Sequence, residues 1–284
     1  MKLARPDVFH PRVVLAGWPH QPAGDGDDAG LVAALRRRGL HAHWLSWDDP
    51  DVSRADLVIL RATRDYARRL DEFVAWTGGV RNLLNPPAVV AWNAHRRYLD
   101  DLANRGVPTL PSQMCRPGER LRSLPAPQVF IGPGVGTGTR RFSDHAKAAE
   151  YVDELHAAGQ SALVHVGDPV PEAVLIFVGG RPSHAFTTQE NALRQGEPDF
   201  EIWDIGAAAL RAAAAAAGVQ VGELLCARAH LVGTRLLELQ LIDPSLGWRR
   251  LDTATRDRAQ REFALSVQSA LGGLGLGPFS HRRP

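Results

Sequence analysis

Short apolar runs alternate with amphipathic segments over the first 110 residues, and this alternation constrains the fold more than any other feature. Residues 13–16 read Val-Val-Leu-Ala and residues 57–60 read Leu-Val-Ile-Leu, so both runs are expected to form buried strands. The segments between them have helical periodicity, and the connections are short. Strands that alternate with helices favour a parallel sheet whose faces are covered by helices.

Boundary residues place the other elements of this region. A helix over residues 27–38 should end at Gly39, with arginines in its last turn, where the helix dipole favours cations. The remaining predictions are strands over 41–45 and 89–92, a helix over 68–76, and a helix over 94–105 that Gly106 ends. We therefore predict an N-terminal α/β domain over residues 1–110.

A proline-rich polar loop over residues 109–127 marks the next boundary. After it we predict strands over 128–131 and 162–166, a glycine-dense loop over 132–139 and a helix over 145–156. These elements would form a small central lid subdomain over residues 111–168.

Residues 169–284 have a different character. The turns Gly179-Gly180 and Gly233-Thr234 each join two runs of alternating residues, which is typical of antiparallel hairpins. The predicted elements are strands over 172–178, 183–188, 224–232 and 235–242, and helices over 205–217 and 254–271. The expected fold class is α/β, with α+β in the C-terminal part.

Composition excludes several classes of function. The 33 basic and 31 acidic residues leave a net charge of only +2, which argues against a nucleic-acid partner. Two cysteines are too few for a zinc ribbon and make a disulfide framework implausible. The N-terminus has no apolar signal sequence, and no apolar run reaches the roughly 18 residues that a membrane span needs. We expect a cytoplasmic protein without a membrane partner.

The glycine-dense loop allows two interpretations. Glycines let a backbone approach phosphate closely and present its N–H groups, and Gly134, Gly136 and Gly138 follow a predicted strand. The loop lacks the Gly-Lys-Ser/Thr ending of a P-loop and the spacing of a Rossmann fingerprint. A flexible structural turn and a phosphate flap both remain open.

A second motif lies on the last predicted hairpin. Residues two apart on a strand share a face, so Arg228, His230, Glu238 and Gln240 should converge on one surface. They could hold a metal ion and an anionic substrate, or they could be an ion pair beside a hydrogen-bonded histidine. Ser183 and His184 follow the predicted turn at Gly179-Gly180, and no acidic residue is placed to complete the triad of a hydrolase with them.

Taken in order, these segments resemble the ATP-grasp superfamily, in particular the branch with D-cycloserine ligase and glutathione-synthetase-like proteins. The resemblance is carried by Arg-Ala-Thr-Arg-Asp-Tyr at residues 61–66, Trp-Asn-Ala-His-Arg-Arg-Tyr-Leu at 92–99, Gly-Val-Pro-Thr at 106–109, Ser-His-Ala at 183–185 and Leu-Glu-Leu-Gln-Leu-Ile-Asp-Pro at 237–244. It implies a three-part grasp that binds Mg-ATP between the central and C-terminal parts. Family members join a carboxylate to an amine through an acyl-phosphate.

The resemblance also implies roles for individual residues, although it assigns no catalytic residue. The implied nucleotide-binding residues are Arg96, Gly134, Gly136, Gly138, Arg140, Arg141 and Glu172; those for substrate are His184 and Arg228; those for metal are Glu238 and Gln240. The cofactors would be ATP and magnesium if the protein is active, and otherwise none.

The sequence departs from the family pattern where phosphate and metal would bind. Three family lysines read Arg96, Gly132 and Thr188, and the metal-ligand aspartate reads His230. Magnesium prefers oxygen ligands, so a neutral imidazole suits it poorly. Losing two charged hydrogen bonds costs about 3–6 kcal/mol, or two to four decades of affinity. Arg140 and Arg141 could compensate in part.

We therefore predict an ATP-grasp protein with a degenerate nucleotide site and a binding or partner role. The alternative is an active ATP- and magnesium-dependent carboxylate–amine ligase. The expected partner is a small-molecule substrate or a protein, and a homo-oligomer is left open.

Overall fold

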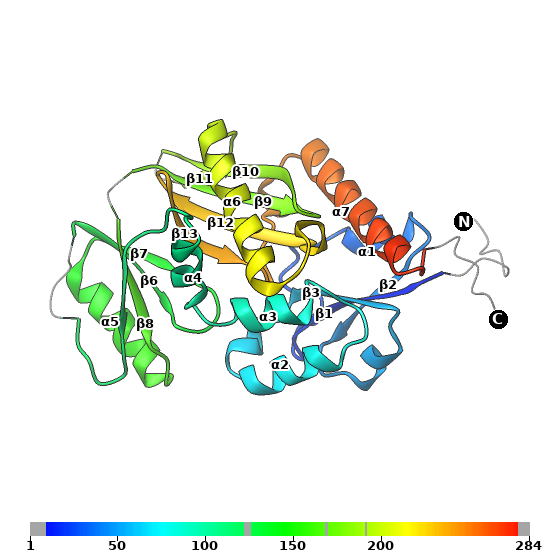
Figure 1. The fold of residues 1–284 in the computed structure, drawn as a ribbon, viewed down its shortest axis with the longest axis horizontal. Coiled ribbons are helices and arrows are strands. Elements are labelled where there is room, and N and C mark those ends of the chain that lie inside the picture. Colours follow the sequence, from blue (N-terminus) through cyan, green and yellow to red (C-terminus); the bar gives the residue numbers. More distant parts are fainter. Residues whose placement is uncertain (1–9, 122–125, 168–169, 191, 278–284) are drawn as a thin grey trace.

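The computed structural model describes residues 10–121, 126–167, 170–190 and 192–277. It contains three sheets (Figure 1). The central subdomain lies at the left end of this view, the N-terminal sheet lies at the lower right, and the C-terminal sheet lies above and between them. Among the described helices, none combines the length and the hydropathy needed to cross a bilayer.

The N-terminal sheet is parallel, with the strand order β2-β1-β3-β4. Its strands are β1 (Arg12–Gly17), β2 (His41–Ser46), β3 (Leu57–Ala62) and the short β4 (Leu83–Leu84). Its helices are α1 (Leu31–Arg36), α2 (Leu70–Gly79), α3 (Pro87–Asn93) and α4 (Tyr98–Asn104). The predicted parallel α/β arrangement is confirmed.

One predicted element in this region was wrong, and two predicted helices are shorter than expected; of these, the helix predicted over 94–105 covers only Tyr98–Asn104. Residues 89–92 were expected to form a strand, but they lie in helix α3, which begins with Pro87 in its first turn. Proline suits that position because its fixed φ matches a helix and its missing N–H is not needed there. The helix expected over 27–38 covers only Leu31–Arg36, because the preceding residues form a loop that ends at Gly30 with a φ of 91°.

The central sheet is antiparallel, with the order β5-β8-β6-β7. Its strands are β5 (Ser112–Cys115), β6 (Gln128–Pro133), β7 (Arg140–Phe142) and β8 (Ala162–Gly167). Helix α5 (His145–Ala157) covers one face through an apolar cluster that includes Val129, Val152 and Val164. The other face of the sheet is turned toward the C-terminal part, since Phe130 packs against Leu237 there.

The C-terminal sheet is antiparallel, with the order β11-β10-β9-β12-β13. Its strands are β9 (Glu172–Val178), β10 (Arg181–Gln189), β11 (Ala192–Gln195), β12 (Cys226–Val232) and β13 (Arg235–Gln240). Helices α6 (Phe200–Ala217) and α7 (Thr253–Gly273) pack against it. The predicted antiparallel hairpins are confirmed.

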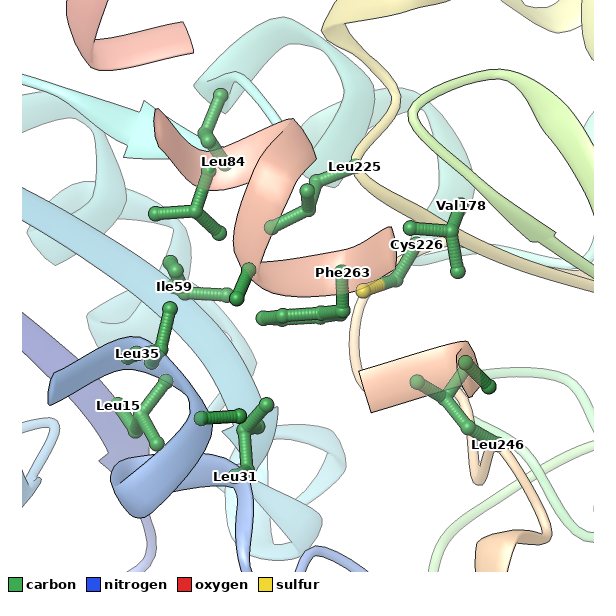
Figure 2. Packing of buried hydrophobic residues seen from close by; sticks show 14 of the residues in the cluster. Leu15, Leu31, Leu35, Ile59, Leu84, Val178, Leu225, Cys226, Leu246 and Phe263 are labelled. Atoms are coloured by element: carbon green, nitrogen blue, oxygen red, sulfur yellow. The ribbon is translucent and has the colours of Figure 1, made fainter. Parts of the chain in front are cut away.

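One buried cluster joins the first and last parts of the chain (Figure 2). Leu15 and Ile59 of the N-terminal sheet, Phe263 of α7 and Val178 of β9 all belong to it. Phe263 and Leu15 are fully buried. The N-terminal and C-terminal parts therefore share a core, which fixes how these two parts lie relative to each other.

Candidate functional site

The last hairpin brings together the four residues that the sequence predicted. In the antiparallel register of β12 and β13, Arg228 lies opposite Gln240 and His230 lies opposite Glu238. All four side chains line one cavity of about 660 Å³. The prediction that they share a face is confirmed.

The cavity lies where all three parts of the chain meet. The C-terminal hairpin forms one wall, and residues Thr137, Gly138 and Thr139 of the glycine loop form another. The rest of the lining comes from the N-terminal part, from β11 and from the segment after β13: Gly24, Asp25, Asp27, Asp28, Arg61, Ala62, Arg64, Tyr66, Ala67, Leu193, Asp243, Ser245 and Arg250. The lining is thus rich in charge of both signs.

Glu238 is held by two side chains from other parts of the protein. Arg96 Nη2 lies 2.6 Å from Glu238 Oε1, and the hydroxyl of Thr139 donates to Oε2 at 3.2 Å. Both Arg96 and Glu238 are 2 % exposed. Burial alone would raise the pKa of Glu238, but the charges of Arg96 and Arg228 outweigh it and lower the pKa. Glu238 is therefore an ionised carboxylate with a cation of the protein already beside it.

Glu172, at the start of β9, is likewise held by two side chains of the protein. Its Oε2 lies 2.8 Å from His230 Nε2, and its Oε1 accepts from Arg141 Nη1 at 2.9 Å. Burial opposes ionisation, but the interactions with His230 and Arg141 together outweigh it and lower the pKa of Glu172. The Arg141 contact ties β7 of the central subdomain to β9 of the C-terminal sheet.

The glycine loop is anchored to the segment before α4. Gly134 accepts from the Arg96 backbone N–H at 3.0 Å, and the Gly136 N–H donates to Ala94 O at 3.3 Å. The Gly134 N–H donates to Ser161 O at 2.8 Å. Gly136 and Gly138 have φ values of 90° and 114°, which only glycine adopts readily. Two N–H groups of the loop are therefore used within the protein.

Seven of the predicted site residues are not part of the described cavity lining: Arg96, Gly134, Gly136, Arg140, Arg141, Glu172 and His184. His184 Nε2 lies 2.7 Å from Leu246 O, so this histidine fixes the segment after β13. Arg140 stacks over the ring of Tyr151 at 4.2 Å and lies 3.8 Å from Glu154. Arg140 thus covers α5 of the central subdomain.

Sequence reasoning missed the N-terminal wall of the cavity. Asp28 and Arg61 form a buried ion pair at 2.8 Å, and Arg61 Nη1 donates to Pro244 O at 3.0 Å. Arg61 belongs to a motif that carried the family resemblance, yet no role was assigned to it. No local pattern pairs it with Asp28, because the two residues meet only in the folded chain.

Asp243 combines a buried carboxylate oxygen with a raised pKa. Its Oδ2 is buried and has no hydrogen-bond partner among the described residues. Burial raises the pKa of Asp243 to about 7, against the opposing charge of Arg61. Near neutral pH this carboxyl group is therefore present in both protonation states.

The surfaces of the central and C-terminal sheets that face each other are packed together. Phe130 and Leu110 contact Val232 and Leu237 in an apolar cluster, and each of the four is at most 6 % exposed. The space between the two sheets is filled by side chains at this point.

Sequence comparison links the chain to cycloserine biosynthesis proteins. Residues 13–85 match the family model of the N-terminal domain of D-cycloserine synthetase DcsG. The cycloserine biosynthesis protein DcsG of Streptomyces lavendulae is 28 % identical over 263 residues, an alignment that covers 78 % of this chain and 88 % of that protein.

Structural comparison gives the same assignment. The crystal structure of D-cycloserine synthetase DcsG matches with a TM-score of 0.72 and 26 % identity, covering 90 % of this chain and 98 % of that one. D-alanine–D-alanine ligase from Bacillus anthracis complexed with ATP matches with a TM-score of 0.65 and 10 % identity, covering 93 % and 98 %. The ATP-grasp ligase PsnB, complexed with a precursor peptide and AMPPNP, matches with a TM-score of 0.54 and 14 % identity, covering 91 % of this chain and 99 % of that one. The chain therefore has the ATP-grasp fold and is similar to the D-cycloserine ligase branch of this superfamily.

Proposed function

We propose that this relative of carboxylate–amine ligases has a degenerate nucleotide site and acts by binding a small charged molecule in the interdomain cavity. One observation carries the proposal: both carboxylates at the predicted nucleotide and metal positions are neutralised from within the protein. Glu238 is paired with Arg96, and Glu172 is paired with His230 and Arg141. A ligand cation would have to displace these partners.

The donor set suits magnesium poorly. Mg²⁺ requires oxygen ligands in near-octahedral geometry and is usually held by carboxylates, water and phosphate. The three side chains beside one another here are one paired carboxylate, one amide and one imidazole, from Glu238, Gln240 and His230. In the described part of the chain, no group of three or more histidine, cysteine or acidic residues could hold a metal ion. The residues present at this position therefore do not fit a magnesium ion.

The positive charge that a triphosphate needs is also reduced. Arg96 is engaged by Glu238, and its Nε donates to Gly136 O at 3.3 Å. Thr188, which replaces a family lysine, hydrogen-bonds through its hydroxyl to the Glu172 backbone. Gly132 has no side chain. Arg141 is the remaining predicted phosphate ligand close to these groups, and it is paired with Glu172.

The packed interface favours the same proposal. In the family, the nucleotide binds between the central and C-terminal parts, which is where Phe130, Val232 and Leu237 are in contact. Opening a slot there would expose about three large apolar side chains, at a cost of roughly 1.5–3 kcal/mol for each. Nucleotide binding would have to overcome that cost in addition to displacing the ion pairs.

Calorimetric titration with Mg-ATP, together with thermal unfolding, tests this function. If the dissociation constant is millimolar, 1 mM ligand adds only about 0.4 kcal/mol to the free energy of unfolding, so the melting temperature should barely move. D-alanine–D-alanine ligase, which has been observed with ATP, serves as the positive control. A magnesium-dependent rise of several degrees that Glu238→Ala abolishes would refute the proposal.

The ligase alternative is favoured by a different observation. The cavity brings Gly138, Arg228 and Gln240 together, and the structural relatives include ligases. In that case Arg96 would exchange Glu238 for phosphate, helped by Arg141, and Glu238 with Gln240 would face the metal. Release of ADP that depends on both an added acid and an added amine would support this alternative.

A further inference from the structure

A second cavity, of about 900 Å³, lies between the N-terminal sheet and helix α7, and we call it the α7 groove. Its described lining shares no residue with the interdomain cavity. Leu84 lines the groove and also belongs to the core that the first and last parts of the chain share (Figure 2). Leu265 and Leu274 line it too, and they are 45 % and 48 % exposed. Large apolar side chains that gather in one exposed groove are typical of an interaction surface.

The α7 groove also carries positive charge. Arg81 and Arg181 are exposed residues of its lining, and neither forms an ion pair or a side-chain hydrogen bond with any residue that the structure describes. Glu223, the one acidic residue of the described lining, accepts from the Gln220 backbone N–H at 2.7 Å. An apolar groove with two unpaired arginines favours a partner that brings an apolar side chain together with carboxylates.

The chain itself carries such a feature at the start of helix α6. Phe200 is 89 % exposed, and no other exposed large apolar residue in the described ranges reaches half that fraction except Leu265 and Leu274. Asp199 and Glu201 are its neighbours, and Asp204 follows one helical turn later on the same face. All three acidic residues are exposed, and none forms an ion pair with a described residue. Aromatic side chains are enriched in protein interfaces, so Phe200 is suited to act as an anchor.

Phe200 and the α7 groove cannot meet within one molecule. Helix α6 runs from Phe200 to Ala217, so its two ends are about 25 Å apart at 1.5 Å per residue. The groove residues Gly222 and Glu223 follow the far end of this helix. A contact between the two features therefore requires two molecules.

We propose that Phe200 of one copy docks in the α7 groove of a second copy, with its flanking carboxylates beside Arg81 and Arg181. The contact is head-to-tail, because the two surfaces that meet are different surfaces of the chain. Such contacts join copies into rings or open chains. One aromatic anchor with a few charges makes a small interface, so the association should be transient and dependent on concentration. The inference goes beyond the proposed function and does not depend on it.

Sedimentation velocity of the full chain at increasing concentration tests the contact. We expect the mean mass to rise with concentration and to fall when salt is added, because salt screens the charged part of the contact. Phe200→Ser and Leu265→Glu should each weaken the association by about tenfold or more. Val170→Ser is the matched control, since Val170 is also exposed, at 40 %, but is not part of the described groove lining. It should leave the association unchanged.

Mixing the two variants tests the head-to-tail geometry. Phe200→Ser keeps an intact groove and Leu265→Glu keeps the phenylalanine, so each alone should be monomeric and the mixture should form a one-to-one dimer. A mixture that stays monomeric would overturn the proposal, as would equal weakening by Val170→Ser. A wild-type chain that is monomeric at every concentration would also overturn it. If a peptide of residues 195–206 still bound to that monomer, the groove would belong to a similar segment of another protein and not to a second copy.

Discussion

The guanidinium of Arg96 lies directly beside Gly132. A Cβ on Gly132 would come within 3.1 Å of Arg96 Nη2 and 2.8 Å of Thr139 Oγ1. These are the two groups that hold Glu238. The glycine at position 132, where the family pattern has a lysine, and the pairing of Glu238 with Arg96 are therefore linked, because a side chain at position 132 would disturb the pair.

A matched pair of glycine substitutions tests this relationship. Gly132→Ala should lower the free energy of unfolding by about 1–3 kcal/mol, as overpacking does in other proteins. Gly134→Ala should change it little or raise it by about 0.4–1 kcal/mol, because a Cβ there meets its neighbours at ordinary distances of 3.4 Å or more. Urea unfolding measures both variants, and equal effects would contradict the close approach of Arg96.

The buried Arg96–Glu238 pair should show strong coupling in a double-mutant cycle. Arg96→Met and Glu238→Leu each leave a buried charge without its partner, so each should cost about 3–5 kcal/mol. The double variant should cost much less than the sum of the two. The exposed Arg54–Asp51 pair, at 3.0 Å, serves as a control and should show no measurable coupling. Additive effects at Arg96 and Glu238 would show that the pair is not formed in solution.

Asp243 should make stability depend on pH. Its pKa is raised to about 7 in the folded protein and is about 3.9 in an unfolded chain, so the folded state holds the proton more tightly. The wild type should therefore lose stability relative to Asp243→Asn as the pH rises from about 4 to 7, by up to roughly 4 kcal/mol. Urea unfolding of both proteins at pH 4, 6 and 8 measures the difference. A constant difference would mean that Asp243 ionises normally.

His165 should have the opposite pH dependence. It is 1 % exposed, and burial together with the charge of Arg96 lowers its pKa to about 4, whereas an unfolded histidine titrates near 6.5. The unfolded state binds the proton first, so the wild type should lose stability relative to His165→Leu as the pH falls from 6.5 to 4. The expected difference is about 2–3 kcal/mol. NMR titration of the His165 ring provides an independent check, since a normal pKa would remove the effect.

Local periodicity was enough to predict the C-terminal hairpin and the face that four of its residues share. Residues two apart on a strand must share a face, so Arg228 and His230 were expected on the same surface as Glu238 and Gln240. The short apolar run at residues 89–92 was misassigned because a buried helix and a buried strand have the same composition over four residues. Only the proline pair before it signals a helix start.

The residue pairs in the N-terminal wall of the cavity could not be predicted from local sequence patterns. Asp28 and Arg61 are 33 residues apart, and Arg61 reaches Pro244 across 183 residues. Such pairs depend on how the sheets pack, which propensity and spacing do not encode. The same holds for His184, whose part in fixing Leu246 is apparent only from the folded chain. The predicted domain boundaries and the roles assigned to the glycines of the loop stay predictions.

Asp27 has a consequence for how this protein could be divided or recombined. Its carboxylate accepts hydrogen bonds from the Ser245 hydroxyl at 3.1 Å, the Gly247 N–H at 2.9 Å and the Arg249 N–H at 3.0 Å. A single side chain near the start of the chain thus shapes a loop that lies more than 200 residues later. If the first 110 residues were replaced by those of another ATP-grasp protein, that loop would lose its three hydrogen bonds to Asp27. The N-terminal and C-terminal halves of this cavity must therefore be exchanged together.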